Sequence, residues 1–199
     1  PAQSVNYVEA HDNLTLADKL NASVKGISPA GVVQLSQFAS SVAILSQGVP
    51  FIQAGQEFVR SKNGDENSYK SSDEVNSLKW STKAKYASTV AYFKGIFALR
   101  AAHPAFRMTT SAQVKSNLKF LSGGENVIAY SINGKAVKDK AATIVVIHNA
   151  NPGTATVTLP NAKKWSVLVK GSKAGTKVLE LFAGAKLKVA GQSTVVLTQ

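Results

Sequence analysis

The chain has 199 residues, enough for one large or two small domains, and its hydrophobic content of 44% is ordinary for a protein with a packed core. It contains no cysteine, which excludes a disulfide framework and a thiolate zinc site. No apolar run reaches the length of a membrane span, so we expect no membrane segment. The chain starts without Met and without a signal-peptide pattern, which we interpret as a chain cut from something longer.

The net charge of +12 is concentrated in the second half of the chain. Residues 101–199 carry twelve lysines and one arginine against three carboxylates. A basic half is compatible with an anionic partner, such as nucleic acid or a cell wall, or with a solvated lysine-rich face. Because the cations are spread along the sequence and no nucleic-acid-binding motif accompanies them, we predict no nucleic-acid partner and leave the cell wall open.

Helical and strand-like patterns alternate in the first half. We expect a turn at Pro29 before a helix, and we expect Gly48 to cap the C-terminal end of that helix. In chain order the patterns predict a strand over 4–10, a short helix over 15–21, a helix over 32–47, a strand over 49–54, an irregular loop over 61–81 and a helix over 82–102.

Short strands separated by turns fill the second half. The strand-like runs cover residues 118–121, 127–132, 143–148, 154–159, 165–169, 178–182, 187–189 and 194–197. Eight short strands at this spacing predict an antiparallel β-sandwich.

The first half is too small to stand as a complete α/β domain. Its strands, joined by crossover helices, would be parallel, and parallel sheets are normally buried on both faces. A full (β/α)₈ barrel needs about 250 residues. We therefore predict an α/β fragment, the last two βα units of a TIM-type (β/α)₈ barrel (residues 1–108), followed by an all-β antiparallel sandwich domain (residues 109–199).

Three segments in the same order carry a family resemblance. They are VNYVEAHDNLTLADKL (5–20), LSQGVPFIQAGQEFVRSKNGDENSY (45–69) and LRAAHPAFRMTT (99–110). They resemble the seventh strand region, the eighth strand with its loop, and the end of the last barrel helix of type I pullulanases in the α-amylase superfamily. The resemblance implies an extracellular, cofactor-free glycosidase that hydrolyses α-1,6-glucosidic bonds in pullulan and branched dextrins by a retaining two-carboxylate mechanism.

His11 and Asp12 are the candidate catalytic residues. By spacing alone, the His-Asp-Asn tripeptide is more typical of a turn. In the family it resembles, the His hydrogen-bonds hydroxyls of the sugar at the cleavage point, and the Asp binds that sugar and distorts it towards the transition state. The resemblance implies these roles for His11 and Asp12. We expect Asn13 to cap the next turn and Glu9 to share a strand face with His11.

The long loop supplies further candidates for substrate binding. Asp65, Asn67 and Tyr69 match positions that contact a neighbouring glucose in the superfamily, although each could equally be a turn residue. Gln56 and Glu57 lie beside the site by the same resemblance. For Glu57, a helix-start carboxylate favoured by the helix dipole explains the residue equally well.

Ion pairing and metal binding in this loop rest on weaker patterns. We expect Arg60 to pair with Asp65 or Glu57. Asp65 and Glu66 are also conceivable calcium ligands, but hydrogen bonding explains them as well, so we assign no metal site.

Other residues qualify the resemblance without changing the site. Ala17 stands where many relatives carry Trp, and Gln53 where many carry His, which softens the prediction of the precise substrate. The remaining aromatic and imidazole residues are more consistent with structural or interdomain roles; they are Trp80, Trp165, His103 and His148.

The two carboxylates that cut the bond have no counterpart in this sequence. In the family they follow the fourth and fifth barrel strands, upstream of this region. We therefore predict that the chain alone is inactive and that its partners are the N-terminal part of the same enzyme and an α-glucan. The alternative function is a cell-surface or carbohydrate-binding accessory module.

Overall fold

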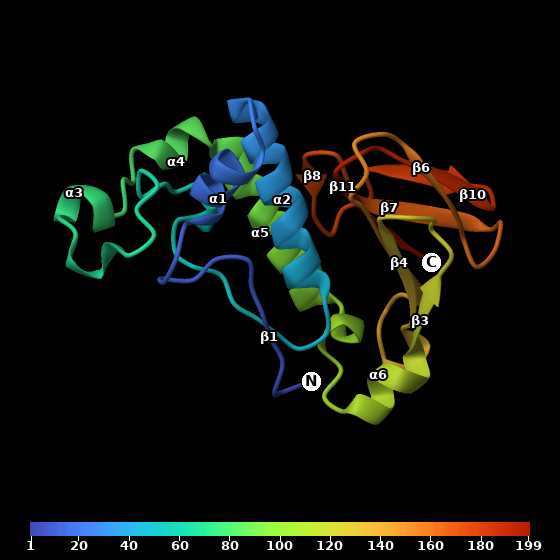
Figure 1. Cartoon of the computed structure of the whole chain (residues 1–199). Coiled ribbons are helices and arrows are strands. Elements are labelled where there is room, and N and C mark those ends of the chain that lie inside the picture. The colour runs from blue at the N-terminus through green and yellow to red at the C-terminus, as the bar shows by residue number, and fades with distance from the viewer.

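The computed structural model describes residues 1–199 and places a helical part on one side of a β-sandwich (Figure 1). Two long helices, α2 and α5, lie side by side against the sandwich, and the short helices α1, α3 and α4 lie on their far side (Figure 1). In chain order the helical part contains β1 (Val5–Asn6), α1 (Leu16–Ser23), α2 (Pro29–Leu45), β2 (Val49–Pro50), the 3₁₀ helices η1 (Gln56–Phe58) and η2 (Ser68–Lys70), α3 (Asp73–Asn76), α4 (Thr82–Lys85), α5 (Ala87–Ala102) and η3 (Pro104–Arg107).

The strands of the helical part are parallel, as predicted, but only two residues long. β1 pairs with β2 alone, and the last hydrogen bond between them runs from Phe51 N to Asn6 O at 2.9 Å. The strands expected over 4–10 and 49–54 are therefore too long. The ladder pairs only Val5 with Val49 and Asn6 with Pro50, and no other strand lies beside β1 or β2 to extend it.

Helix α2 begins earlier than the periodicity indicates. Ser28 Oγ accepts a hydrogen bond from Gly31 N at 3.1 Å, and Pro29 occupies the first turn, where its missing N–H is harmless. The turn expected at Pro29 is wrong, because Pro29 is the first residue of α2, and Pro after a serine N-cap is typical of the start of a helix. Gly48 is not the cap either, since the helix ends at Leu45 with Ser46 as its cap.

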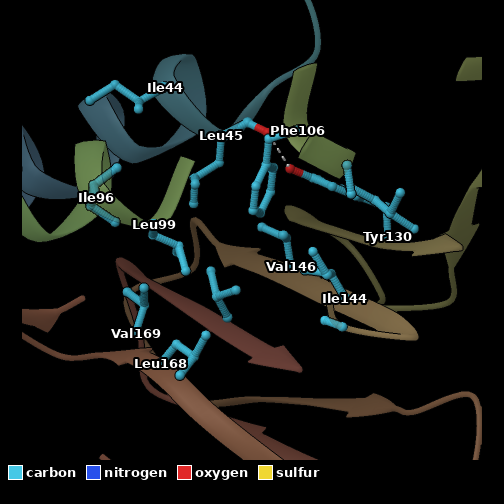
Figure 2. Packing of buried hydrophobic residues seen from close by; sticks show 14 of the residues in the cluster. Ile44, Leu45, Ile96, Leu99, Phe106, Tyr130, Ile144, Val146, Leu168 and Val169 are labelled. Atoms are coloured by element: carbon cyan, nitrogen blue, oxygen red, sulfur yellow. Dashed lines mark hydrogen bonds between the residues drawn. The ribbon is translucent and has the colours of Figure 1, made fainter. Parts of the chain in front are cut away.

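Side chains from elsewhere in the chain satisfy the carbonyls at the C-terminus of α2. The Arg100 guanidinium donates three hydrogen bonds of 2.7–2.8 Å to carbonyls in and just after the last turn. The Tyr130 hydroxyl donates to Leu45 O at 3.0 Å (Figure 2). A cation at a helix C-terminus is favourable, so these contacts fix α2 against both α5 and the sandwich.

The helix expected over 82–102 is interrupted once. It is divided at Tyr86, which has φ −107° and ψ 30°, into α4 and α5. A further helix, α6 (Ser111–Asn117), precedes the first sandwich strand and was not expected. Its start is a capping box between Thr110 and Gln113, a spacing that is visible in the sequence.

The predicted antiparallel sandwich is confirmed. All eight expected strands are present, and β8 is an addition. One sheet has the order β3-β4-β5-β11-β7-β8 with β9 also paired to β7, and a second sheet pairs β6 with β10. The strands are β3 (Leu118–Leu121), β4 (Val127–Asn133), β5 (Thr143–Asn149), β6 (Ala155–Thr158), β7 (Lys164–Lys170), β8 (Lys173–Ala174), β9 (Glu180–Ala183), β10 (Lys186–Val189) and β11 (Ser193–Thr198), with a 3₁₀ turn η4 (Lys135–Val137).

Two hydrophobic clusters hold the molecule together. A cluster of 11 buried residues lies between the two sheets and includes Trp165, which is fully buried. A cluster of 17 lies between α2, α5, η3 and the larger sheet (Figure 2). On Gly95 of α5 a Cβ would lie 2.0 Å from Ala174 O, so only glycine allows β8 to approach this helix.

Two of the three histidines, His103 and His148, are buried within the fold. His103 Nδ1 lies 2.8 Å from Asp139 Oδ1, and Asp139 Oδ2 accepts from Ala105 N at 3.1 Å. This pair joins the end of α5 to the turn before β5. His148 Nδ1 hydrogen-bonds Thr194 Oγ1 at 2.9 Å, and burial lowers the pKa of His148 to about 4.

Candidate functional site

The His11 and Asp12 side chains project into solvent from the segment between β1 and α1. Their side chains are 85% and 81% exposed, and His11 Nε2 lies 3.6 Å from Asp12 Oδ2. Asn13 follows with φ 64° and makes no cap. Thr15 is the N-cap of α1, accepting from Asp18 N at 3.2 Å, so the role expected for Asn13 is wrong.

In contrast to these side chains, the backbone of the segment is held from beneath. The buried Glu9 accepts a hydrogen bond from Leu16 N at 2.8 Å. The Gln53 amide, with its nitrogen facing this segment, donates to Ala10 O and to Glu9 Oε1, each at 2.8 Å. Lys62 Nζ donates to His11 O at 3.1 Å. Two exposed polar groups are thus presented on a fixed backbone, as a binding site requires.

Burial perturbs the carboxyl group beneath this segment. Glu9 is 3% exposed, and desolvation raises its pKa from 4.5 to about 7. The Leu16 N–H and the nearby cations Arg60 and Lys62 act in the opposite direction, while the Asp18 carboxylate raises the pKa further. Glu9 therefore changes protonation near neutral pH two residues from His11.

Helix α1 is joined to the long loop through the buried Asp18. Its carboxylate accepts from Lys62 N at 2.7 Å, Ser61 Oγ at 2.6 Å and Thr15 Oγ1 at 2.9 Å. Lys62 is also buried, and its ammonium donates to Ser68 Oγ at 2.6 Å as well as to the carbonyl of His11. These contacts bring the loop beside the His11 segment.

Asp18 and Lys62 were not among the candidates from the sequence. The spacing from Thr15 to Asp18 resembles a capping box and could have indicated a role at the helix start. Nothing in the sequence marks Lys62, whose partners are 6 and 51 residues away.

The loop residues Asp65, Asn67 and Tyr69 lie together, but their side chains have different environments. Asp65 Oδ1 accepts from Asn67 N at 3.0 Å and Oδ2 accepts from Ser71 Oγ. These hydrogen bonds, that of Ser71 foremost, lower the pKa of Asp65. Tyr69 is 74% exposed, with the Lys70 ammonium 5.2 Å from its ring centroid. Asp65 shapes the loop, whereas the Tyr69 ring is free to contact a ligand.

Glu57 and Gln56 support the neighbouring turn. Glu57 Oε2 accepts from Gly55 N at 3.0 Å at the start of η1, and the buried Gln56 donates to Ser40 Oγ at 2.8 Å. Arg60 makes no ion pair, so its expected pairing with Asp65 or Glu57 is wrong. Its guanidinium instead donates to a backbone carbonyl, Asn76 O.

The two tryptophans lie in different environments. Trp80 is 59% exposed and rests on Phe58, with ring centroids 5.7 Å apart, whereas Trp165 belongs to the sandwich core. No three His, Asp or Glu side chains lie close enough together to hold a metal ion. None of the helices is both long and apolar enough to cross a membrane.

Comparison with known proteins tests the family resemblance that the sequence indicates. The family model for the pullulanase all-beta domain matches residues 114–173. The structure of pullulanase from Bacillus acidopullulyticus matches all of this chain with a TM-score of 0.96 at 39% identity. The resemblance to type I pullulanases is confirmed.

Other pullulanases give the same result. Pullulanase type I from Bacillus subtilis strain 168, complexed with maltose, matches 100% of this chain with a TM-score of 0.93 at 36% identity. The curated pullulanase sequence of that organism is 40% identical over 161 residues, which is 81% of this chain. The chain spans only about a quarter of these pullulanases, 24% and 28% of the two structures and 22% of the curated sequence.

Proposed function

We propose that this chain is the C-terminal part of a starch-debranching glycoside hydrolase that cleaves α-1,6-glucosidic bonds in pullulan and branched dextrins. In this proposal residues 1–108 provide the last two βα units of a (β/α)₈ barrel, and residues 109–199 form the sandwich domain that follows it. The match to pullulanase structures over the whole length of the chain is the observation that supports this function most. The exposed His11 and Asp12 on an anchored segment agree with it.

The uncovered strands support the barrel. Apolar side chains on and after β1 and β2 are between 43% and 57% exposed; they are Val5, Tyr7, Val49 and Phe51. The rings of Tyr7 and Phe51 lie edge to face with their centroids 6.1 Å apart, and both side chains stay exposed. A parallel pair is stable when strands and helices bury both of its faces, so upstream βα units of the same enzyme are the proposed partner.

His11 and Asp12 have the chemistry to hold a sugar in its transition state. A carboxylate accepts hydrogen bonds from sugar hydroxyls and offsets the positive charge of an oxocarbenium-like transition state. An imidazole donates to or accepts from a neighbouring hydroxyl. We assign these roles to Asp12 and His11. The nucleophile and the acid/base of a retaining mechanism would come from the upstream units, so the chain alone would be inactive.

The loop that follows β2 would form a neighbouring sugar subsite. The exposed Tyr69 ring offers a stacking surface for the apolar face of a glucose, and Asn67 offers an amide. Asp65 and Glu57 would act by keeping the loop and the Gly55 turn in shape, through the hydrogen bonds they already make. Because pullulan is a large polymer, we propose an extracellular location.

A chimeric enzyme tests this function. In it, the chain replaces the matching segment of the Bacillus subtilis pullulanase, and release of reducing sugar from pullulan is measured. We expect the chimera to be active and the isolated chain to be inactive. Asp12→Asn should lower kcat of the chimera about 10²- to 10³-fold, because it removes charge that stabilises the transition state.

A matched control separates this effect from a general change of charge. Asp73→Asn removes another exposed carboxylate, at the start of α3, and should leave kcat unchanged. An Asp12→Asn chimera with the kcat of the unmodified chimera would exclude the assigned role. Sugar release by the isolated chain would show that the cutting carboxylates lie within it.

We also propose that the sandwich contacts an anionic cell-wall polymer. Lys186 and Lys188 lie on the solvent face of β10. Lys163 precedes β7, and Lys164, its first residue, pairs with Ala183 at the end of β9, the strand before β10. None of these four lysines forms an ion pair. Retention on cell-wall material at low salt should fall when Lys186 and Lys188 are both changed to Gln. The same change at two lysines elsewhere, 135 and 140, is the control, and equal retention of both variants would reject this surface.

A further inference from the structure

A cleft with a cavity of about 330 Å³ lies between the helical part and the sandwich, and shares no residue with the site around His11. Its walls are the first half of α2, the N-terminal half of α5, the β7–β8 turn and the β10–β11 turn. In Figure 1 this is the region where α2 and α5 approach β8 and β11. The volume suits one or two hexose units, within the usual range for ligand pockets.

The lining of the cleft is polar but uncharged. Among its 14 residues there is no Asp, Glu, Lys, Arg or His, although 17% of the chain is charged. The rings of Phe38 and Tyr92 line it together with side chains that carry an amide or an aliphatic hydroxyl, which are Gln34, Gln37, Gln192, Ser88, Ser172, Ser193 and Thr194. Amides and hydroxyls beside aromatic faces suit a neutral polyhydroxylated ligand, because they hydrogen-bond its hydroxyls and cover its C–H faces.

Gln37 is the most informative residue of the cleft. It is only 6% exposed, yet its side-chain amide takes part in none of the hydrogen bonds within the protein. The amide atoms are not among the buried polar atoms that lack a partner, so the amide reaches solvent in the cleft and is available to a ligand. Its neighbour Gln34 is committed to the fold, since its Nε2 donates to Gly191 O at 3.2 Å and to Gln192 O at 3.3 Å. The half-buried Phe38 follows Gln37 on α2 and also lines the cleft.

We propose that this cleft is an auxiliary binding site for α-linked glucose units. The neutral sugar chemistry follows from the lining, and the choice of an α-glucan rests on the proposed function. Such a site would hold one part of a polymeric substrate while another part occupies the active site, which raises the local concentration of bonds to be cut.

Titration of the ¹⁵N-labelled chain with maltotriose tests the proposal by NMR. We expect saturable shifts of the Gln37 side-chain amide and of the backbone amides of the β10–β11 turn. Gln37→Leu should weaken binding about fivefold to tenfold, because it removes hydrogen bonds to the sugar without changing the size of the side chain much. Ala190→Phe, at an exposed position on the rim, should block the cleft without disturbing the core.

Three comparisons make the result decisive. Gln3→Leu, at an exposed position outside the cleft, should bind like the unmodified chain. Cellotriose should bind at least about fivefold more weakly than maltotriose, and equal binding would overturn the assignment to α-glucan. The site itself would be overturned if maltotriose at about 20 mM caused no shifts, or if neither Gln37→Leu nor Ala190→Phe changed the binding.

The outcome is separable from that of the proposed catalytic role. Asp12→Asn should leave the titration unchanged, since Asp12 does not line the cleft. A silent Asp12→Asn change in the chimera, with maltotriose still bound at Gln37, would reject the catalytic role alone. A loss of kcat in the Asp12→Asn chimera, with no binding of maltotriose at Gln37, would reject the cleft site alone.

Discussion

Glu9→Gln should make the protein more stable above neutral pH, although it removes a charged residue from the base of the candidate site. In the folded protein burial raises the pKa of Glu9 to about 7, whereas in the unfolded chain the carboxyl has its ordinary value of 4.5. Between these values the folded state retains a proton that the unfolded chain releases. The free energy of unfolding therefore decreases as pH rises through this window.

The magnitude follows from the size of the shift. Each pH unit changes the free energy of unfolding by about 1.4 kcal/mol, so a shift of this size costs about 3 kcal/mol once pH exceeds the folded pKa. A glutamine has no proton to lose, and its amide oxygen can still accept from Leu16 N. The variant should match the unmodified chain near pH 4.5 and exceed its stability by up to about 3 kcal/mol at pH 8.

Urea unfolding at a series of pH values, followed by tryptophan fluorescence, which changes when the buried Trp165 becomes exposed, measures this difference. Subtracting the two pH profiles removes the contribution of all other groups. Glu66→Gln, which removes an exposed carboxylate nearby, is the control for a loss of negative charge and should give a flat difference. A Glu9→Gln difference that stays constant between pH 5 and 8 would refute the reasoning.

Three further substitutions test the contacts that hold α2, α5 and the sandwich together, each by urea unfolding. Gly95→Ala should destabilise the chain by at least about 2 kcal/mol, although alanine normally stabilises a helix interior by about 1 kcal/mol, because its Cβ would overlap Ala174 O. Gly175→Ala, with open space around it, is the control. Arg100→Met should cost about 2–4 kcal/mol by removing three charge-assisted hydrogen bonds from the C-terminus of α2, and an unchanged midpoint would contradict that role. Asp139→Asn should cost about 3 kcal/mol at pH 7. Burial alone raises the pKa of Asp139, but the Ala141 and Ala105 N–H groups and His103 lower it below its ordinary value. The stability that the Asp139 carboxylate contributes is therefore lost as pH falls through that lowered pKa. A difference in unfolding free energy between Asp139→Asn and the unmodified chain that persists undiminished in acid would contradict this.

The strands of the sandwich could be predicted from the sequence because their signal is local. Alternating apolar residues between Gly, Asn and Pro turns fix where a strand begins and ends. The strands before α1 and after α2 were predicted too long, because the length of a parallel strand depends on neighbours that the local pattern does not describe. The prediction at Pro29 is wrong for a related reason. Proline can end a helix or begin one, and here the N-cap Ser28 before it makes it the beginning of α2.

The candidate site was predictable in part. The sequence indicates His11 and Asp12, and the structure leaves both side chains exposed, but their roles stay predictions. The residues that hold this segment were not predictable, because Gln53 and Lys62 reach it from 43 and 51 positions away. The sequence predicts a carboxylate partner for Arg60 because opposite charges are easy to match, whereas the partner in the fold is a backbone carbonyl.

The buried cluster beneath α2 and α5 also constrains how such a protein can be rearranged in evolution. Side chains on both sides of residue 108 contribute to it, from Ile44 and Leu99 before it to Ile144 and Val196 after it. A recombination event that exchanged the sandwich alone would leave an unmatched apolar face on each product. Shuffling is therefore expected at positions outside this shared interior, and the two halves should be inherited together, as one cooperative unit whose sequences change in concert.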